Sequence, residues 1–231
     1  MPAEKGLDVL LQRNAVWRGG SRPVAAAGTV ATGFPLLDEE LAGGGWPRGA
    51  LTELIAAQAG IGALRLLMPA LARLARERRW ICWVAPPHVP YAPALAAAGI
   101  DLSRILLVHP KAHQDGLWAV EQSLRSGTCG AVLCWPTLED GVVLRRLQLA
   151  AEAGNALGFL FRSPRFARRP SPSALRLQLA AAPDGRLSVS ILKRRGGWAT
   201  GPLYLDPPFP EDGALALYPP AAAGAGSLHP R

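Results

Sequence analysis

The residues best placed for phosphate chemistry lie where the first buried strand of the chain runs into a helical pattern. A phosphate-binding loop at such a junction reads GxxxxGK[ST]: backbone N–H groups hold phosphates, the lysine reaches the outer phosphates and the hydroxyl holds magnesium. When the second glycine of this motif is set on Gly62, the first falls on Ala57, the lysine on Ala63 and the hydroxyl on Leu64. Gly60 and Gly62 still offer N–H groups to an anion at the predicted helix start, but ATP hydrolysis needs the missing cation and hydroxyl.

The carboxylate that would hold magnesium is missing as well. In a nucleotide-hydrolysing fold of this kind a later strand ends in Asp, whereas the corresponding strand here ends in Trp135 and Pro136. The strand Trp80–Ala85 runs into two prolines and His88, so it brings no acidic residue that could activate water. We therefore predict a protein that is not an enzyme, uses no cofactor and works by binding partners.

Cysteines and histidines form no pattern typical of a metal site. The three cysteines, Cys82, Cys129 and Cys134, include no CxxC pair, and the first and last lie in apolar runs. His109 and His113 are four residues apart, but a proline lies between them and no third ligand is near. We expect small core cysteines, loop histidines and no bound metal.

A loop rich in Pro, Ser and Arg follows the predicted strand that ends at Phe161. Its basic and aromatic residues are Arg162, Arg165, Phe166, Arg168 and Arg169. The guanidinium groups could pair with DNA phosphates while the ring stacks on a base, which gives sequence-independent binding that weakens with salt. The same loop could dock on an acidic protein surface or be a solvated basic loop, and the residues alone leave these readings open.

The overall composition agrees with a partner-binding domain. The net charge of +8 in 231 residues suits contacts to phosphate or carboxylate, although a GC-rich genome produces the same arginine bias. The 49% of hydrophobic residues allows a packed core. No apolar run approaches the ~20 residues that span a bilayer, and no signal peptide opens the chain, so we expect a cytoplasmic protein without membrane contact.

Strands and helices alternate along the middle of the chain, a pattern typical of βαβ units and a mostly parallel sheet flanked by helices. The predicted strands are Thr52–Ala56, Trp80–Ala85, Ile105–Val108, Ala131–Trp135 and Ala156–Phe161. The predicted helices are Ile61–Arg79, with Pro69 kinking it or starting a new turn, Tyr91–Ala98, Gln114–Ser126 and Glu139–Ala153. Period-two alternation then predicts the strands Ala174–Ala181 and Leu187–Lys193, an antiparallel hairpin that closes the sheet.

The chain divides into three parts: an N-terminal arm over residues 1–23, a core domain over 24–208 and a tail over 209–231. The arm carries apolar positions at Leu7, Leu10, Leu11 and Val16, roughly a helical stripe, and its candidate docking residues are Leu7, Leu10, Leu11 and Trp17. Such a stripe could lie in a groove of a partner or pack on its own domain. The tail is rich in Pro, Ala and Gly without periodicity, and we expect it to be disordered.

Two stretches resemble the RecA family. Val30-Ala31-Thr32-Gly33, Gly44-Gly45-Trp46-Pro47 and Gly49 are similar to the segment that leads RecA-like proteins into their phosphate loop, and residues 141–179 resemble the RecA segment around its DNA-facing loop. The resemblance implies a RecA-like P-loop-type fold with a degenerate P-loop. It also implies that Lys193, Arg194 and Arg195, at the end of the last predicted strand, could reach the nucleotide of a neighbouring RecA-like subunit. A charged strand end without such a role is the alternative.

The chain is more similar still to the ImuA family, RecA-like proteins encoded with error-prone polymerase components. The similar segments are Gly60-Ile61-Gly62, Trp83-Val84-Ala85-Pro86-Pro87-His88, Gly99–Arg104, Leu117–Gln122 and Trp135-Pro136. This resemblance implies an accessory factor of SOS-induced translesion DNA synthesis, nucleoid-associated when DNA is damaged. The expected partners are an ImuB-type Y-family-like protein and an error-prone replicative-type DNA polymerase, with RecA and DNA as further candidates. The alternative is a SulA-like division inhibitor, also similar to a RecA domain without a P-loop, which would bind the tubulin-like division protein.

Overall fold

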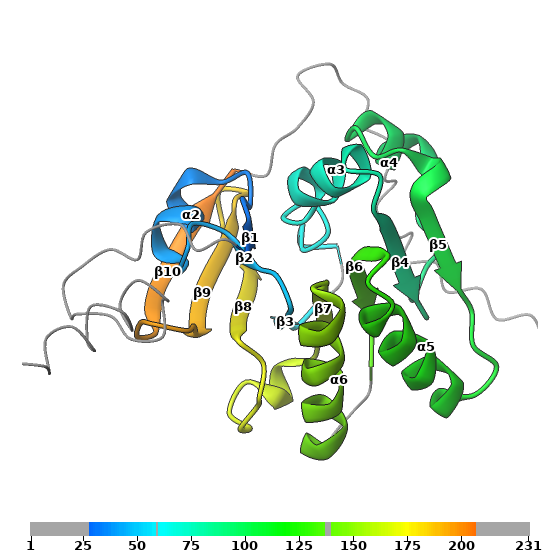
Figure 1. The fold of residues 1–231 in the computed structure, drawn as a ribbon. Helices are drawn as coiled ribbons and strands as arrows, with labels where there is room; N and C mark the ends of the chain where they lie inside the picture. The colour runs from blue at the N-terminus through cyan, green and yellow to red at the C-terminus, as the bar shows by residue number, and fades with distance from the viewer. Residues whose placement is uncertain (1–27, 59, 137–139, 207–231) are drawn as a thin grey trace, which may run out of the picture.

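A computed structural model describes residues 28–58, 60–136 and 140–206 of the chain (Figure 1). The strands are β1 (Thr29–Val30), β2 (Trp46–Pro47), β3 (Ala50–Ala56), β4 (Trp80–Val84), β5 (Ile105–Val108), β6 (Cys129–Cys134), β7 (Leu157–Arg162), β8 (Leu175–Ala181), β9 (Leu187–Lys193) and β10 (Thr200–Leu205). The helices are α2 (Pro35–Glu40), α3 (Met68–Arg76), α4 (Ala92–Ala97), α5 (His113–Arg125) and α6 (Gly141–Gly154), with short 3-10 turns at Leu102–Arg104 and Pro164–Phe166.

Eight of these strands form one sheet in the order β10-β9-β8-β3-β7-β6-β4-β5, and β1 pairs with β2 separately. The six strands from β8 to β5 in this order run parallel to one another. β9 pairs antiparallel with both β8 and β10. The predicted mixed α/β fold with a mostly parallel sheet is therefore confirmed, and the predicted hairpin corresponds to β8 and β9.

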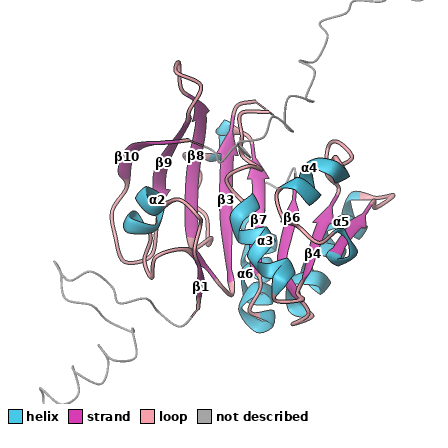
Figure 2. Ribbon diagram, turned by 90° about the horizontal axis from the view of Figure 1, so that it is seen from above, coloured by secondary structure: helices cyan, strands magenta, loops and turns pink. Residues whose placement is uncertain are grey.

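Helices cover both faces of the parallel part of the sheet, as Figures 1 and 2 show. On one face α3 and α4 bury Leu71 and Leu95 against Trp83 and Phe159 of the strands. On the other face α5 and α6 bury side chains such as Leu124 and Leu147 against the opposite side of β4, β6 and β7. β6 is buried along its whole length because helices cover both faces of the sheet. This burial explains why its sequence is an apolar run.

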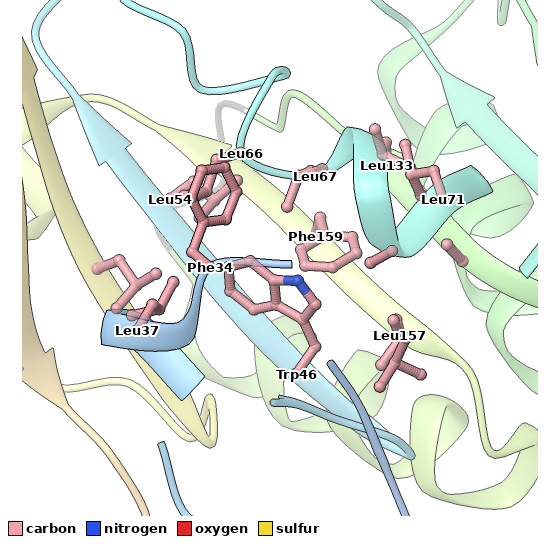
Figure 3. Close-up of a cluster of buried hydrophobic side chains, with 14 of the residues drawn as sticks. Phe34, Leu37, Trp46, Leu54, Leu66, Leu67, Leu71, Leu133, Leu157 and Phe159 are labelled. Carbon is pink, nitrogen blue, oxygen red and sulfur yellow. The ribbon is translucent and has the colours of Figure 1, made fainter. Parts of the chain in front are cut away.

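The segment before β3 packs on the same face as α3. Trp46 of β2 lies edge-on to Phe159 of β7, with ring centroids 5.3 Å apart, and Phe34 and Leu37 lie beside them (Figure 3). Gly45 is required here because a Cβ at this position would lie 2.3 Å from the carbonyl oxygen of Val30. The glycine-rich approach to β3 is therefore a tightly packed part of the core.

The helix predicted over Ile61–Arg79 is wrong at its start, because α3 begins at Met68 and residues 63–67 form turns. Pro69 lies in the first turn of α3, where its missing N–H costs no helical hydrogen bond, so the helix starts there. The sequence did not predict α2, β1, β2 or β10. β10 contains Gly201 and Pro202, which disfavour strands, and it is held by its pairing with β9.

The predicted arm over residues 1–23 and the predicted tail over 209–231 lie outside the described residues. Within the residues that are described, none of the helices has the length and apolar character needed to cross a membrane.

Candidate binding site at the carboxyl edge of the sheet

In the loop that follows β3, the two glycines are separated from the start of the next helix, unlike those of a phosphate-binding turn. Gly60 and Gly62 both have positive φ angles, +83° and +97°, which glycine adopts without strain. The chain then turns through Leu66, whose N–H donates to the Gly62 carbonyl at 3.1 Å, before α3 begins at Met68. The N-terminus of the helix, where its dipole favours anions, therefore lies six residues beyond Gly62 rather than at it. Among the described residues of this loop, Gly60 and Gly62 therefore do not stand at the start of α3, where the anion site was expected.

Seven residues singled out from the sequence line one pocket of about 480 Å³. They are Ala57, Gly60, Gly62, Ala63, Leu64, Trp135 and Arg162. The pocket lies at the carboxyl ends of β3, β4, β6 and β7, the edge at which parallel α/β sheets bind ligands. The structure thus brings together the loop after β3 and the position where a metal-binding Asp would stand, although both lack the residues for phosphate chemistry.

Aromatic rings form one wall of this pocket. Trp135 stacks on Phe161, with ring centroids 4.5 Å apart and planes 7° apart, and Trp83 stacks on the other side at 5.9 Å. These three side chains come from the ends of the neighbouring strands β4, β6 and β7 and point to the face that carries α3. An apolar wall of this kind disfavours a hydrated triphosphate and suits an apolar ligand or side chain.

Sequence reasoning missed Trp83 and Phe161 as members of the site. The available signal was an aromatic residue at or near the carboxyl end of three of the four strands β4 to β7, since β5 between them carries none. That β4, β6 and β7 are neighbours is seen only from the strand order of the sheet. The three aromatic side chains share a face because paired residues of parallel strands, and residues two apart, point the same way.

A buried ionic cluster lies under the loop that follows β7. Glu53 of β3, with no exposed surface, accepts hydrogen bonds from Arg162 at 3.3 Å and from Arg176 at 3.2 Å. Ser173 donates to the same carboxylate at 2.8 Å, and Ser171 also donates to it. Burial lowers the pKa of the Arg162 guanidinium, while the Glu53 carboxylate acts in the opposite direction.

Arg176 fixes the path of the loop over this cluster. Its guanidinium donates to the carbonyl oxygens of Phe166, Ala167 and Arg169 at 2.6, 3.3 and 3.0 Å. Because three backbone acceptors share one buried cation, the loop is held in a defined shape. The predicted candidates in this loop thus fall into two classes, buried Arg162 and Phe166 and exposed Arg165, Arg168 and Arg169.

Phe166 does not have the exposed ring that the sequence reading needs. The side chain is 2% exposed, and the guanidinium carbons of Arg162, Arg165 and Arg169 lie 3.8, 4.8 and 5.6 Å from its ring centroid. These cations cover the ring and gain from its electron-rich face. Stacking of Phe166 on a nucleic-acid base is therefore excluded in this conformation, and Arg162 is committed to Glu53.

The three basic residues at the end of β9 point to different places. Lys193 donates to the Ser171 carbonyl at 2.7 Å, Arg194 pairs with Glu40 at 2.7 Å, and Arg195 approaches Glu152 at 3.8 Å. Burial and then the nearby Arg176 charge lower the pKa of Lys193. These three side chains thus contact acceptors of their own domain and do not extend together toward a neighbouring subunit.

The remaining predicted sites divide as follows. The arm residues Leu7, Leu10, Leu11 and Trp17 lie outside the described part of the chain. The cysteines Cys82, Cys129 and Cys134 are buried as free thiols. Among the described residues, no three His, Cys, Asp or Glu side chains lie together in a way that could hold a metal ion.

Comparisons with known proteins identify one family. A family model described as "Cell division inhibitor SulA" matches residues 49–158, from the start of β3 into β7. The cell division inhibitor SulA of Photorhabdus laumondii is 35% identical over 116 residues, which are 50% of this chain and 65% of that protein. SulA of Serratia marcescens is 32% identical over 124 residues, which are 52% of this chain and 72% of that protein.

Two further comparisons describe how far the similarity extends. The match spans 56% of SulA from Edwardsiella piscicida, so several relatives are covered over less than two thirds of their length. The crystal structure of SulA from Pseudomonas aeruginosa is 28% identical with a TM-score of 0.41, covering 48% of this chain and 97% of that one.

The expected membership of the ImuA family is wrong. The segments quoted for it, from Gly60 to Pro136, all lie inside the region that matches SulA proteins. Short motifs at strand ends and in loops indicate the fold of a protein, and one fold can serve more than one function. They therefore did not separate two families that share this arrangement of strands.

Proposed function

Because the chain belongs to the SulA family, we propose that it inhibits cell division by binding the tubulin-like division protein. The observation that carries this proposal is the family match over residues 49–158, which includes β3 to β6 and helices α3 to α6. This is the part of the domain in which helices cover both faces of the parallel sheet.

The proposal replaces the role in translesion synthesis. The relatives that match this chain are division inhibitors, so the ImuB-type protein, the error-prone polymerase, RecA and DNA are not its expected partners. The role in DNA repair and mutagenesis that the ImuA resemblance implied is therefore wrong as well. The SOS-related alternative, a division inhibitor, is the better supported reading.

We propose further that the protein acts without catalysis, on a RecA-like scaffold with a degenerate P-loop. Ala63 and Leu64 stand where the lysine and the hydroxyl would be, and Trp135 stands where the metal carboxylate would be. The aromatic wall formed with Trp83 and Phe161 supports this view, because rings stand where the metal and the phosphates would be held, and Arg162 in the same lining is paired with Glu53. Inhibition then comes from occupying a surface of the partner.

The exposed residues Arg165, Arg168 and Arg169 form the contact surface that we assign to the partner, and the guanidinium groups of Arg165 and Arg169 also lie over the Phe166 ring. Arg176 holds the loop that carries them in one shape, so binding to an acidic surface costs little ordering entropy. The binding is expected to weaken as salt rises, because exposed charges are screened within about 10 Å at 0.1 M salt.

The cellular test is expression from an inducible promoter in the native host. Division inhibition predicts filamentous cells with segregated nucleoids and an unchanged mutation rate. An increase in mutation rate without filaments would remove the proposal and favour the polymerase reading.

The biochemical test measures GTPase activity and sedimentable polymer of the purified tubulin-like division protein with increasing amounts of this chain. Both should fall as the two proteins approach equal concentrations. Arg168→Glu should weaken the effect most at low salt, while Arg145→Glu, the same charge change at an exposed position of α6, should leave it unchanged. Inhibition lost equally in both variants would contradict the assigned surface, and no inhibition by the unaltered protein would contradict the function.

A further inference from the structure

A second hollow, of about 510 Å³, runs along α3 and is open to solvent. Its walls are α3, α4 and the segment just before α2, and its apolar lining includes Met68, Ala72, Tyr91, Leu95 and Ala98. It shares Leu64, Arg65, Trp83 and Pro90 with the pocket at the carboxyl edge. We call this surface, between α3 and α4, the α3–α4 groove. An apolar groove of this size on a domain surface is typical of a site that is covered by something else.

The groove contains a buried donor without an acceptor. The indole N–H of Trp83 has no hydrogen-bond partner among the described residues, and this side chain is 1% exposed. This N–H is itself covered, so an occupant of the groove could supply its acceptor only if the Trp83 ring turned toward the groove. A buried unsatisfied N–H costs about 1–3 kcal/mol, which would favour such a turn.

The chain enters the described part of the domain at one end of this groove. The Gly28 carbonyl accepts a hydrogen bond from the Arg48 N–H at 2.7 Å, and the Arg48 guanidinium pairs with Glu77, directly after α3, at 2.9 Å. At the other end Gly33 lies so close to Pro69 that a Cβ would fall 2.5 Å from the proline ring. Residues 28–33 therefore run along α3 from its C-terminal to its N-terminal end, and residues 1–27 join at the C-terminal end.

The sequence of residues 1–27 supplies a segment with matching chemistry. Leu7, Leu10, Leu11 and Trp17 recur at helical spacing, and Asn14 lies on the same face with an amide oxygen as acceptor. A helix over the eleven residues 7–17 would be about 16.5 Å long at 1.5 Å per residue, one turn or less beyond the ~13.5 Å of the nine residues of α3. The ten residues from 18 to 27 can span up to ~33 Å, so the tether permits docking.

We propose that residues 4–17 form an amphipathic helix that occupies the α3–α4 groove of its own domain. The apolar stripe covers the groove lining, and the tether keeps the arm at a millimolar effective concentration, above that of a second copy or a partner. This inference concerns the domain itself and does not depend on the proposed function.

The test is a thiol cross-linking experiment in the full-length chain. Ala15→Cys flanks the stripe, and Ala97→Cys stands on the exposed rim of the groove on α4. The native cysteines are buried, and burial raises their pKa values, so they compete little for a short bismaleimide. The pair should cross-link within one chain about tenfold faster than the matched control, Ala15→Cys with Leu149→Cys on α6 of the opposite face, at all protein concentrations.

Two further variants test the contact from both sides. Ala94→Glu in the groove should reduce the cross-linking rate to that of the control, and Leu10→Glu in the arm should do the same even if the groove variant fails to fold. Equal rates for the two cysteine pairs would overturn the inference. Cross-linking only between chains, seen when the single-cysteine variants are mixed, would also overturn it and assign the groove to a second copy.

Discussion

Glu53 and Arg162 form an ion pair at 3.3 Å with 0% and 3% of their side chains exposed. The pair joins β3 to β7 in the middle of the sheet, and Arg176 adds a second guanidinium to the same carboxylate at 3.2 Å. Removing one partner of a buried ion pair leaves the other charge without compensation. This cluster therefore connects the stability of the sheet to the shape of the basic loop above it.

Replacing Glu53 with Ala is expected to lower the free energy of unfolding by about 3–5 kcal/mol, because two buried guanidinium groups lose their anion. Urea unfolding followed by circular dichroism measures this loss. Glu77→Ala, which removes the exposed pair with Arg48, is the matched control and should cost less than about 1 kcal/mol. A similar decrease in the free energy of unfolding of both variants would show that the buried cluster contributes no more to stability than an exposed ion pair.

Gly154→Ala is expected to destabilise the protein by about 3 kcal/mol through overpacking. A Cβ at this position would lie 1.9 Å from the carbonyl oxygen of Leu124, so α5 and α6 could not keep their present separation. Gly141→Ala is the control at the other end of α6, where a Cβ meets nothing within 4 Å. The control should be neutral or gain up to ~0.5 kcal/mol from helix propensity, and a neutral Gly154→Ala would contradict the close approach.

Stability should fall at alkaline pH because of the buried cysteines. Burial raises the pKa of the Cys82 thiol to about 11, and it raises the pKa values of Cys129 and Cys134 as well. In the unfolded chain these thiols ionise near their ordinary pKa of about 8.5, so above that pH the unfolded state loses protons that the folded state retains. The stabilisation is complete below this pH and is lost as pH rises toward the folded pKa.

The measurement compares urea unfolding at pH 8 and pH 10 for the unaltered protein and Cys82→Ala. One thiol contributes about 1 kcal/mol of the loss for each pH unit above its unfolded pKa, so the variant should lose less than the unaltered protein. Identical losses in the two proteins would mean that Cys82 ionises normally in the folded state.

The parallel sheet could be predicted because its strands are buried on both faces and read as apolar runs, as in Cys129–Cys134. The start of α3 could not, since the periodic leucines at positions 64, 67 and 71 continue through the turns that precede Met68. The burial of the Phe166 side chain could not be predicted, because it depends on Arg176, ten residues later, which donates a hydrogen bond to the Phe166 carbonyl oxygen. The aromatic wall was only partly within reach of the sequence. Trp83, Trp135 and Phe161 stand at or near the ends of predicted strands, but the order that makes β4, β6 and β7 neighbours is a property of the folded sheet.

Returning the missing P-loop residues should not return nucleotide binding. Ala63→Lys with Leu64→Thr supplies the cation and the hydroxyl, but α3 still begins at Met68, and the rings of Trp135 and Phe161 still line the pocket. A ligand present at 100 times its Kd stabilises the folded state by about 2.7 kcal/mol. We expect no change in the thermal midpoint of either protein in 1 mM Mg-ATP, and a rise in the midpoint of the unaltered chain would mean that the pocket binds a triphosphate through backbone N–H groups alone.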